Sequence, residues 1–511
     1  MTDRFYITTP IYYVNAAPHV GHAYTSIAAD VLARFKRLDG YDVFFLTGTD
    51  EHGQKVEKAA ADAGLAVQAF TDRVSEDFRD MTRRMGVSND DFIRTTEDRH
   101  KASTTELWRR LVAADQIYLG HYEGWYAVRD EAFYDEGELT KRPDGSFIAP
   151  SGAPVEWVRE PSYFFRLSAW QDKLLELYEN TPDFIGPNAR RNEVMSFVRG
   201  GLRDLSVSRT SFRWGIPVPG APDHVMYVWL DALNNYLTAC GFPDETNPRW
   251  KFWPADVHLV GKDITRFHAV YWPAFLMAAG LALPKRISSH GWWTIEGEKM
   301  SKSLGNVIDP RELVDSFGLD AVRFFLLREV PFGNDGDFSR KALISRMNSE
   351  LANDLGNLAQ RSLSLIAKNL DGILPGRGAI TEADAVILAA AQGLPSAVRR
   401  QLDRQAFHEA LEDVWKVIRA ANAYIDHQAP WTLRKTDPAR MADVLRVLAD
   451  VQRVIATVLQ PFMPDAMGRM LDQLGVPEDA RMLTALDTAL PGGITLPPPQ
   501  GIFPRFVEEA A

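Results

Sequence analysis

The first fifty residues constrain the fold most, because they alternate between strand and helix patterns. Residues 5–7 and 11–13 are β-branched and aromatic, as in strands. Apolar residues then recur at intervals of three and four over residues 20–38, which predicts an amphipathic helix of about five turns. Residues 43–46 form a continuous apolar run, typical of a strand in a parallel sheet, and the polar residues 47–53 follow it. The chain therefore begins as a β–α–β unit, in which ligands bind at the carboxyl ends of the strands.

The 511 residues are too many for one hydrophobic core, and the sequence pattern changes twice along the chain. Residues 118–213 are rich in turns and aromatic residues, which predicts a small β-containing insertion. The α/β pattern then returns, and three long apolar stripes near the end predict a helical bundle. We expect an α/β half, the insertion, a second α/β half, a lysine-containing connecting region and a helical domain with a wrapping tail, over residues 1–117, 118–213, 214–292, 293–345 and 346–511.

Composition excludes several classes of protein. The single cysteine, Cys240, rules out an internal disulfide and a cysteine-knuckle metal site. No apolar run approaches the length of a membrane span and the first residues do not resemble a signal peptide, so we expect a cytoplasmic protein. The net charge of −11 does not indicate nucleic-acid binding, although local pairs such as Arg190 with Arg191 leave it open.

Two histidines, His19 and His22, stand at the start of the predicted helix with Gly21 between them. Three interpretations are open. As metal ligands they need a third ligand, and as core residues they leave four ring nitrogens to satisfy. As phosphate ligands they fit the context better, because a helix N-terminus attracts anions, imidazole N–H groups can donate to a phosphate, and Gly21 lets a nucleotide approach the backbone. The context favours the third interpretation.

A second motif lies in residues 297–306, where Lys299 and Lys302 are separated by two residues in a loop between two glycines. Residues 309–312 follow with the pattern of a helix N-terminus. A loop with two ammonium groups could close on the β- and γ-phosphates of a nucleotide. Most such sequences are solvated basic loops, but the five-residue run from Lys299 to Ser303 is too specific to arise by chance.

The motifs at residues 19–22 and 299–303 resemble the paired HIGH and KMSKS signatures of class I aminoacyl-tRNA synthetases. Further blocks, in order and over essentially the whole chain, resemble the methionyl-tRNA synthetase family. These blocks read TTPIYYVNAAPHVGHAYT, TGTDEHGQK, YVWLDALNNY, GKDITRFH and SHGWWTIEGEKMSKSLGN.

The resemblance implies a Rossmann-like α/β catalytic domain of the class I type, split by a connective insertion and followed by an α-helical anticodon-binding domain. It implies that the carboxylate of L-methionine attacks the α-phosphate of ATP, giving methionyl-adenylate and pyrophosphate. The 2′-hydroxyl of the terminal adenosine of tRNA(Met) then takes the methionyl group, for initiation and elongation of protein synthesis. ATP is expected with Mg²⁺, and positioning and charge stabilisation are expected to dominate catalysis.

The resemblance also assigns residues to each substrate. The implied catalytic side chains are those of His19, His22, Lys299 and Lys302. ATP is implied to contact His19, Gly21, His22, Gly261, Lys262, Asp263, Lys299, Met300, Ser301, Lys302 and Ser303. Methionine is implied to place its ammonium on Asp50 and its side chain in a pocket shaped by Ile11, Tyr13, Trp229, Ala232, Tyr236 and His290. The CAU anticodon is implied to contact Asn357, Arg361, Pro430 and Trp431.

Two departures from the family pattern bear on metal content and assembly. Many relatives carry zinc-binding cysteines in the insertion, whereas residues 128–131 here are Val, Arg, Asp and Glu, so we expect no structural zinc. The carboxyl-terminal dimerisation domain of some relatives has no counterpart here, which favours a monomer.

Three other functions compete with this interpretation. Synthetases for leucine, isoleucine or valine carry a much larger insertion, and the cysteine enzyme needs zinc-binding cysteines. A small nucleotidylyltransferase shares the HxGH pattern but would lack the helical bundle. A non-catalytic tRNA-binding paralogue would not need both phosphate motifs intact.

Overall fold

A parallel sheet organises the amino-terminal part of the chain. In the computed structural model, which describes residues 3–130, 132–295, 298–299 and 307–507, the strands run in the order β10–β16–β15–β1–β3–β2, and β4 also pairs with β3. All these neighbours pair in parallel. The strands are β1 (Arg4–Thr8), β2 (Tyr12–Tyr13), β3 (Asp42–Asp50), β4 (Asp91–Arg94), β10 (Ile185–Gly186), β15 (Val257–Gly261) and β16 (Ile287–His290).

The predicted β–α–β start is confirmed. The helix expected over residues 20–38 is α1 (Val20–Leu38), which packs on β1 and β3. The apolar run at residues 43–46 lies inside β3, between β1 and β2. Because β2 pairs with the carboxyl end of β3, Tyr13 stands opposite Asp50. The first strand pairings therefore already bring two of the predicted site residues together.

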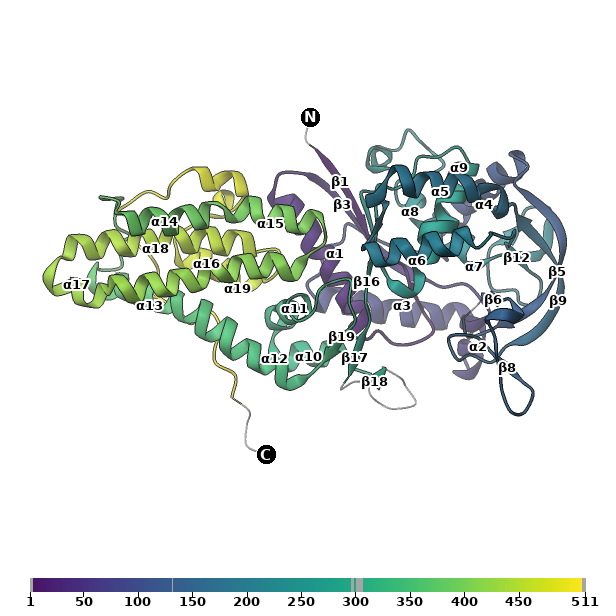
Figure 1. Ribbon diagram of the computed structural model, residues 1–511, viewed down its shortest axis with the longest axis horizontal. Helices are drawn as coiled ribbons and strands as arrows, with labels where there is room; N and C mark the ends of the chain where they lie inside the picture. Colours follow the sequence, from purple (N-terminus) through teal and green to yellow (C-terminus); the bar gives the residue numbers. More distant parts are fainter. Residues whose placement is uncertain (1–2, 131, 296–297, 300–306, 508–511) are drawn as a thin grey trace.

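Helices cover both faces of this sheet (Figure 1). Alternate residues of a strand face opposite sides, and two hydrophobic clusters divide accordingly: Phe5 and Ile7 of β1 belong to one, and Tyr6 belongs to the other. The helices of this half are α2 (Gln54–Asp62), α3 (Val67–Arg84), α4 (Asp98–Ala113), α5 (Gln171–Asn180), α6 (Asn188–Arg199), α7 (Val228–Leu233), α8 (Asn235–Thr238) and α9 (Trp272–Ala278).

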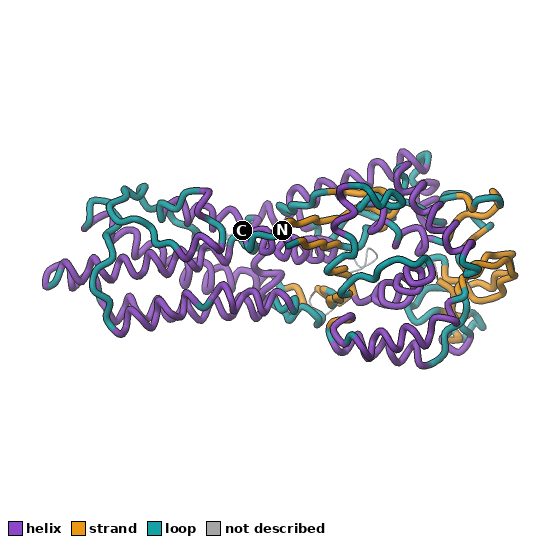
Figure 2. Tube along the Cα trace, turned by 90° about the horizontal axis from the view of Figure 1, so that it is seen from above, coloured by secondary structure: helices purple, strands orange, loops and turns teal. Residues whose placement is uncertain are grey.

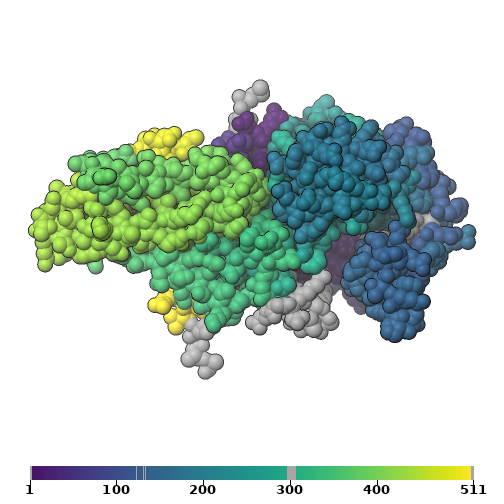
Figure 3. Space-filling view, viewed as in Figure 1, coloured from purple at the N-terminus to yellow at the C-terminus, as the bar shows by residue number. Residues whose placement is uncertain are grey.

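The strands β5 and β9 pair as a long antiparallel ribbon at the centre of the insertion, and Figure 1 labels them at the end of the molecule opposite the bundle. Figure 3 shows that end in blue, the colour of these residues. The sequence pattern indicated only β structure there, yet α5, α6 and β10 lie in the same stretch, and β10 joins the main sheet. The turn- and aromatic-rich stretch behind that expectation is residues 122–157, and α5 and α6 follow it in the chain. The smaller strands are β5 (Ile117–Ala127), β6 (Ala132–Tyr134), β7 (Thr140–Lys141), β8 (Phe147–Ile148), β9 (Glu156–Phe165), β11 (Leu205–Ser206), β12 (Ser208–Arg209), β13 (Pro217–Val218) and β14 (Ala221–Met226).

The helical bundle predicted from the three apolar stripes is confirmed, and strands are confined almost entirely to the other half (Figure 2). The first stripe runs through a π-helical stretch, Met347–Gly356, which widens the helix and which a 3.6-residue periodicity cannot reveal. The helices are α12 (Arg340–Arg346), α13 (Asn357–Asn369), α14 (Glu382–Gln392), α15 (Leu394–Asp403), α16 (Phe407–Gln428), α17 (Pro430–Thr436), α18 (Pro438–Leu459) and α19 (Pro464–Gln473).

A connecting region joins the two halves. It consists of β17 (Trp293–Ile295), β18 (Glu298–Lys299), α10 (Pro310–Phe317), α11 (Leu319–Arg328) and β19 (Gly336–Phe338). The guanidinium of Arg323, fully buried in α11, donates to Asp30 of α1 at 2.7 Å. The same group donates to the backbone carbonyls of Pro461 and Phe462, between α18 and α19, at 2.8 and 3.0 Å. One buried side chain therefore ties the helix that begins with His19 and His22 to the bundle.

Among the helices of the described residues, none combines the length and the apolar character that a membrane crossing requires.

Candidate active site

A cavity of about 570 Å³ opens where β3, β15 and β16 end and α1 begins. This is the edge at which parallel sheets place their ligands. Residues that the sequence predicted separately for nucleotide and for amino acid share its wall. They are Ile11, Tyr13, His19, Gly21, His22, Asp50, Trp229, Ala232, Tyr236, Gly261, Asp263 and His290.

The remaining predicted ATP residues lie elsewhere or outside the described part of the chain. The ammonium of Lys262 pairs with Asp335 at 2.6 Å and lies 4.2 Å from the centre of the Trp292 ring, beside the cavity. The backbone of Lys299 forms part of β18, antiparallel to β17. The other predicted residues of this motif, Met300, Ser301, Lys302 and Ser303, lie outside the described residues.

The two histidines form the N-terminal cap of α1. Nδ1 of His19 accepts from the backbone N–H of Gly21, and Nδ1 of His22 accepts from the backbone N–H of His19, both at 3.1 Å. Because both Nδ1 atoms are acceptors, the ring hydrogens are on Nε2. Burial, together with the neighbouring His19, holds the pKa of His22 well below its usual range, so this ring is neutral. The arrangement presents N–H donors at a helix N-terminus, which suits an anion better than a metal.

Gly21 lines the cavity as expected for a residue near the nucleotide, and the structure shows a further constraint on it. A Cβ at this position would lie 3.0 Å from Cε1 of His19 and 3.1 Å from its Nδ1. Glycine therefore leaves room for the His19 ring to fold back over the helix start. The ring centres of His19 and His22 are 3.8 Å apart as a result.

Aromatic side chains from two separate elements form the apolar side of the cavity. The Trp229 ring stacks on the Phe267 ring with 3.8 Å between their centres and an interplanar angle of 12°. Tyr236 is almost fully buried, and burial raises the pKa of its hydroxyl. A thioether is polarizable and packs well against such rings.

His268 also lines this side, and sequence reasoning did not single it out. Its Nδ1 donates to the carbonyl of Ile264 at 3.0 Å, so its Nε2 accepts from the Tyr236 hydroxyl at 2.7 Å. Burial lowers the pKa of His268 to about 4, which keeps the ring neutral. The i, i+4 spacing of Ile264 and His268 within the GKDITRFH block was the signal that could have identified it.

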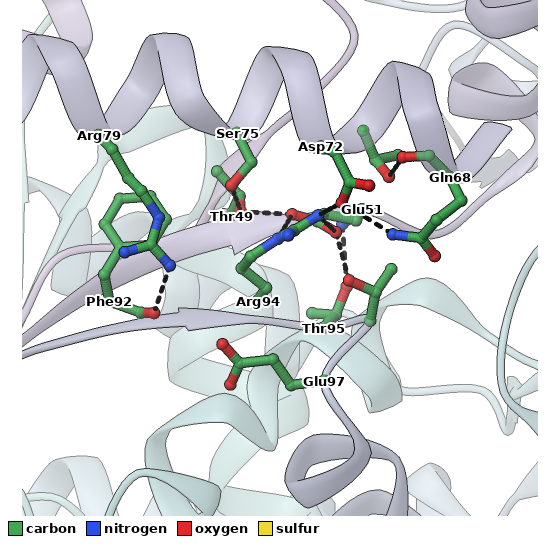
Figure 4. A network of polar contacts seen from close by, with 12 residues as sticks. Thr49, Glu51, Gln68, Asp72, Ser75, Arg79, Phe92, Arg94, Thr95 and Glu97 are labelled. Carbon is green, nitrogen blue, oxygen red and sulfur yellow. Dashed lines mark hydrogen bonds and ion pairs between the residues drawn. The ribbon is translucent and has the colours of Figure 1, made fainter. Parts of the chain in front are cut away.

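Asp50 ends β3 as a buried carboxylate at the cavity wall, and its neighbour Glu51 is anchored on the opposite side. Arg94 reaches from β4 to the Glu51 carboxylate, with Nε at 2.6 Å and Nη2 at 2.9 Å, and also contacts Asp72 of α3 (Figure 4). The Thr49 hydroxyl donates to Glu51 at 2.8 Å. This network fixes the backbone on which Asp50 stands.

The nucleotide side of the cavity combines polar groups from β15, β16 and the residues after them. Asp263 accepts from Nε1 of Trp292 at 3.2 Å. The fully enclosed ring of His290 contacts the Thr25 hydroxyl of α1 through Nε2 at 2.7 Å. His290 therefore stands beside α1 and lines the same cavity as Tyr236 and His268.

The insertion reaches the cavity through Arg129 and Asp130. The Asp130 carboxylate accepts from the Tyr134 hydroxyl at 3.0 Å and from the Ser151 hydroxyl, while Arg129 donates to the Ser151 carbonyl. Hydrogen bonds thus hold the segment where relatives were expected to carry cysteines. Within the described ranges, no group of three or more His, Cys, Asp or Glu residues is arranged to hold a metal ion.

At the far end of the bundle, two of the predicted anticodon residues meet. The guanidinium of Arg361 lies 5.2 Å from the centre of the Trp431 ring and pairs with Asp426 at 2.5 Å. Trp431 is 42 % exposed, an unusual state for a large aromatic side chain. Asn357 begins α13 one turn before Arg361, and Pro430 begins α17 next to Trp431.

The structure combines a parallel sheet, a histidine-capped helix over its cavity, a connective insertion and an attached helical bundle. This combination defines a class I aminoacyl-tRNA synthetase. Residues 5–363 match the family described as tRNA synthetases class I (M), and residues 374–511 match the anticodon binding domain of methionyl tRNA ligase. The chain belongs to the methionyl-tRNA synthetase family.

Individual relatives agree along the full length. The methionine–tRNA ligase of Mesorhizobium japonicum is 56 % identical, covering 99 % of this chain and 98 % of its own, and that of Rickettsia felis is 58 % identical over 99 % of each. The structure of Mycobacterium tuberculosis methionyl-tRNA synthetase in complex with methionyl-adenylate superposes with a TM-score of 0.97 at 55 % identity, covering 99 % of this chain and all of that one. The family, fold class and enzyme class predicted from the sequence are confirmed.

Proposed function

We propose that the cavity binds methionine and ATP side by side and joins them as methionyl-adenylate. The supporting observation is that one cavity wall holds both a helix N-terminus capped by imidazole N–H donors and an aromatic pocket with a buried carboxylate. The first suits phosphate, and the second suits an amino acid that presents its α-ammonium and a thioether side chain. The Mycobacterium tuberculosis relative was solved with methionyl-adenylate, the product of this step.

In the first step, a carboxylate oxygen of methionine attacks the α-phosphorus of ATP. The bond from the α-phosphorus to the bridging oxygen breaks, and pyrophosphate leaves with its electron pair. His19 and His22 donate from Nε2 to the phosphate oxygens, with the α1 dipole adding a partial positive charge. Lys299 and Lys302 neutralise the leaving pyrophosphate. The protein supplies position and charge rather than a covalent intermediate.

In this proposal the Asp50 carboxylate binds the methionine ammonium. Tyr13 lies opposite Asp50 in the pairing of β2 with β3. Ile11, Trp229 and Ala232 surround the side chain, and the neutral Tyr236–His268 pair closes its end without burying a charge near the thioether.

In the second step, the tRNA contacts both the cavity and the far end of the helical bundle. The 2′-hydroxyl oxygen of the terminal adenosine attacks the acyl carbon, the bond from that carbon to the phosphate oxygen breaks with its electron pair going to AMP, and the hydroxyl proton passes to the leaving phosphate or to water. At the bundle, Trp431 stacks on an unpaired anticodon base, while Arg361 and Asn357 donate to base edges. The Arg361–Trp431 contact holds both side chains ready on one surface.

Magnesium accompanies the nucleotide in this proposal. Substrate phosphates and water would hold most of the coordination sphere of Mg²⁺, and Asp263, which lines the cavity, would supply a carboxylate ligand. The enzyme is further proposed to act as a monomer in the cytoplasm, which sedimentation of the purified protein and fractionation of cells would test.

ATP–pyrophosphate exchange with each of the twenty amino acids tests the assignment. Exchange is expected with methionine. Exchange with another amino acid only, or with none, would overturn the proposal.

A further inference from the structure

Asp50 is the last residue of β3, and Glu51 and His52 follow it directly, with their side chains on partners from other elements. Glu51 is fully buried against Arg94, as described above. His52 is 4 % exposed, and its Nδ1 lies 2.7 Å from Oδ2 of Asp231. Asp50 is therefore followed directly by two anchored residues, Glu51 held by Arg94 of β4 and His52 held by Asp231 of α7.

Asp231 is fully buried and engages two imidazoles at once. Its second oxygen, Oδ1, lies 2.7 Å from Nε2 of His100, which comes from α4 and is itself fully buried. Because carboxylate oxygens only accept, both imidazoles donate to Asp231. Burial raises the pKa of Asp231, but the two imidazoles outweigh it and lower the pKa to about 2, so the carboxylate is ionised.

The position of Asp231 in α7 gives this network a link to the cavity. Trp229 stands two residues before it and Ala232 directly after it, and both line the cavity wall. His52 stands two residues after Asp50, which also lines the cavity. The contact between Asp231 and His52 consequently joins the two walls that are proposed to hold the two ends of methionine.

We propose that Asp231 is a positioning residue for methionine recognition, which sets the spacing between Asp50 and the aromatic wall of α7 through His52. The inference rests on the proposed role of Asp50 as the ammonium ligand. With the spacing fixed, one ligand can place its ammonium on Asp50 and its side chain beside Trp229 at the same time. Without this spacing, a ligand can still contact Asp50 or Trp229, but one methionine molecule cannot contact both.

The competing interpretation is that the network only stabilises the fold. A buried carboxylate that serves two buried imidazoles is costly to remove in either case, because the imidazole N–H groups lose their acceptor. Stability alone therefore cannot separate the two interpretations. The test has to measure how methionine is bound.

The variant Asp231→Asn keeps the size of the side chain and retains one acceptor oxygen. We expect the KM for methionine in ATP–pyrophosphate exchange to rise about tenfold, the effect of losing roughly 1.4 kcal/mol of binding. The KM for ATP is expected to stay unchanged, and kcat to change by less than about threefold, because the phosphate donors are untouched.

A pair of inhibitors reports on the ammonium contact directly. L-Methioninol carries the ammonium and the thioether, whereas 4-(methylthio)butan-1-ol lacks the ammonium. In the unmodified enzyme the ratio of their inhibition constants measures the contribution of Asp50. We expect this ratio to fall toward one in Asp231→Asn, a change that a loss of stability would not produce.

Asp384→Asn is the matched control. Asp384 is a fully buried carboxylate in the bundle that accepts from Tyr424 and Arg440, so the variant loses stability far from the cavity. Its KM for methionine and its inhibitor ratio are expected to match the unmodified enzyme. His52→Phe is the second test variant, since it keeps a ring against Trp214 but removes the donor to Asp231, and it is expected to reproduce the rise in KM.

Asp50→Asn separates the failure of this inference from the failure of the site assignment. If Asp50→Asn abolishes the inhibitor ratio while Asp231→Asn and His52→Phe leave it intact, the positioning role is overturned and the site stands. If Asp50→Asn leaves the ratio intact, the ammonium assignment fails and the inference fails with it.

Discussion

Nδ1 of His22 accepts a hydrogen bond from the backbone N–H of His19, and this bond decides which nitrogen of His22 can meet a substrate. A side chain that only had to fill space or bind a metal would not need this tautomer. The bond caps α1 and leaves Nε2–H as the donor, so capping and the proposed phosphate contact use different atoms of one ring. The two roles can therefore be separated by substitution.

His22→Asn should keep the cap but lose the donor, because an asparagine oxygen can stand near the position of Nδ1 and nothing replaces Nε2. We expect the rate of adenylate formation to fall about a hundredfold, the usual effect of removing one transition-state donor. Stopped-flow measurement of adenylate formation gives the rate, and thermal unfolding checks that the cap survives. A variant with an unchanged rate would contradict the role of His22.

Stability should fall in mild acid, and His268 should account for part of the slope. Its pKa is about 4 in the folded chain, lowered by burial, while an unfolded imidazole titrates near about 6.5. The unfolded state therefore binds a proton that the folded state does not between these pH values, and the free energy of unfolding falls as the pH drops. The contribution is about 1.4 kcal/mol per pH unit in that window.

Urea unfolding of the parent and of His268→Gln at pH 7.5, 6.0 and 5.0 measures this contribution. The parent should lose stability more steeply than the variant below pH 6.5. Equal slopes would mean that the His268 ring takes up its proton in the folded state as readily as in the unfolded one.

Trp431→Ala should impair tRNA charging without affecting amino-acid activation. Stacking of a base on an aromatic ring contributes about 1–3 kcal/mol, so the KM for tRNA(Met) should rise at least fivefold. ATP–pyrophosphate exchange, which needs no tRNA, should be unchanged, and Trp431→Phe should restore most of the affinity. A Trp431→Ala variant that charges tRNA normally would remove Trp431 from the anticodon site.

The purified protein should contain no structural zinc, because hydrogen bonds around Asp130 already hold the segment where relatives carry cysteines. Elemental analysis should find far less than one zinc per chain, and chelator treatment should leave the unfolding temperature unchanged. Asp130→Ala should loosen the insertion, which limited proteolysis would detect. Stoichiometric zinc would contradict the expectation.

The parts of the fold that were predicted are those specified by local pattern. The helix α1, the buried run in β3 and the apolar stripes of α16 and α18 each show their periodicity within one segment. The π-helical stretch Met347–Gly356 was missed because its extra residue per turn comes from packing, which no short-range pattern records.

The residues of the candidate site also fall into those that the sequence predicted and those that it did not. Motifs carried by short continuous runs, such as His19 with His22, were found from the sequence. His268 was not, because its significance lies in a hydrogen bond to Tyr236, thirty-two positions earlier in the chain. Asp231 was also missed, since its partners His52 and His100 come from two other elements and only the folded chain brings them together.

The buried Arg323 connects the α/β half of the molecule to the helical bundle. Its guanidinium is bonded to α1 on one side and to the turn between α18 and α19 on the other. These bonds couple the two halves, because a tilt of the bundle would displace the helix that begins with the paired histidines. If the anticodon binds at Trp431 as proposed, the protein fixes the distance from that contact to the cavity, so a tRNA of another length or bend would not reach both.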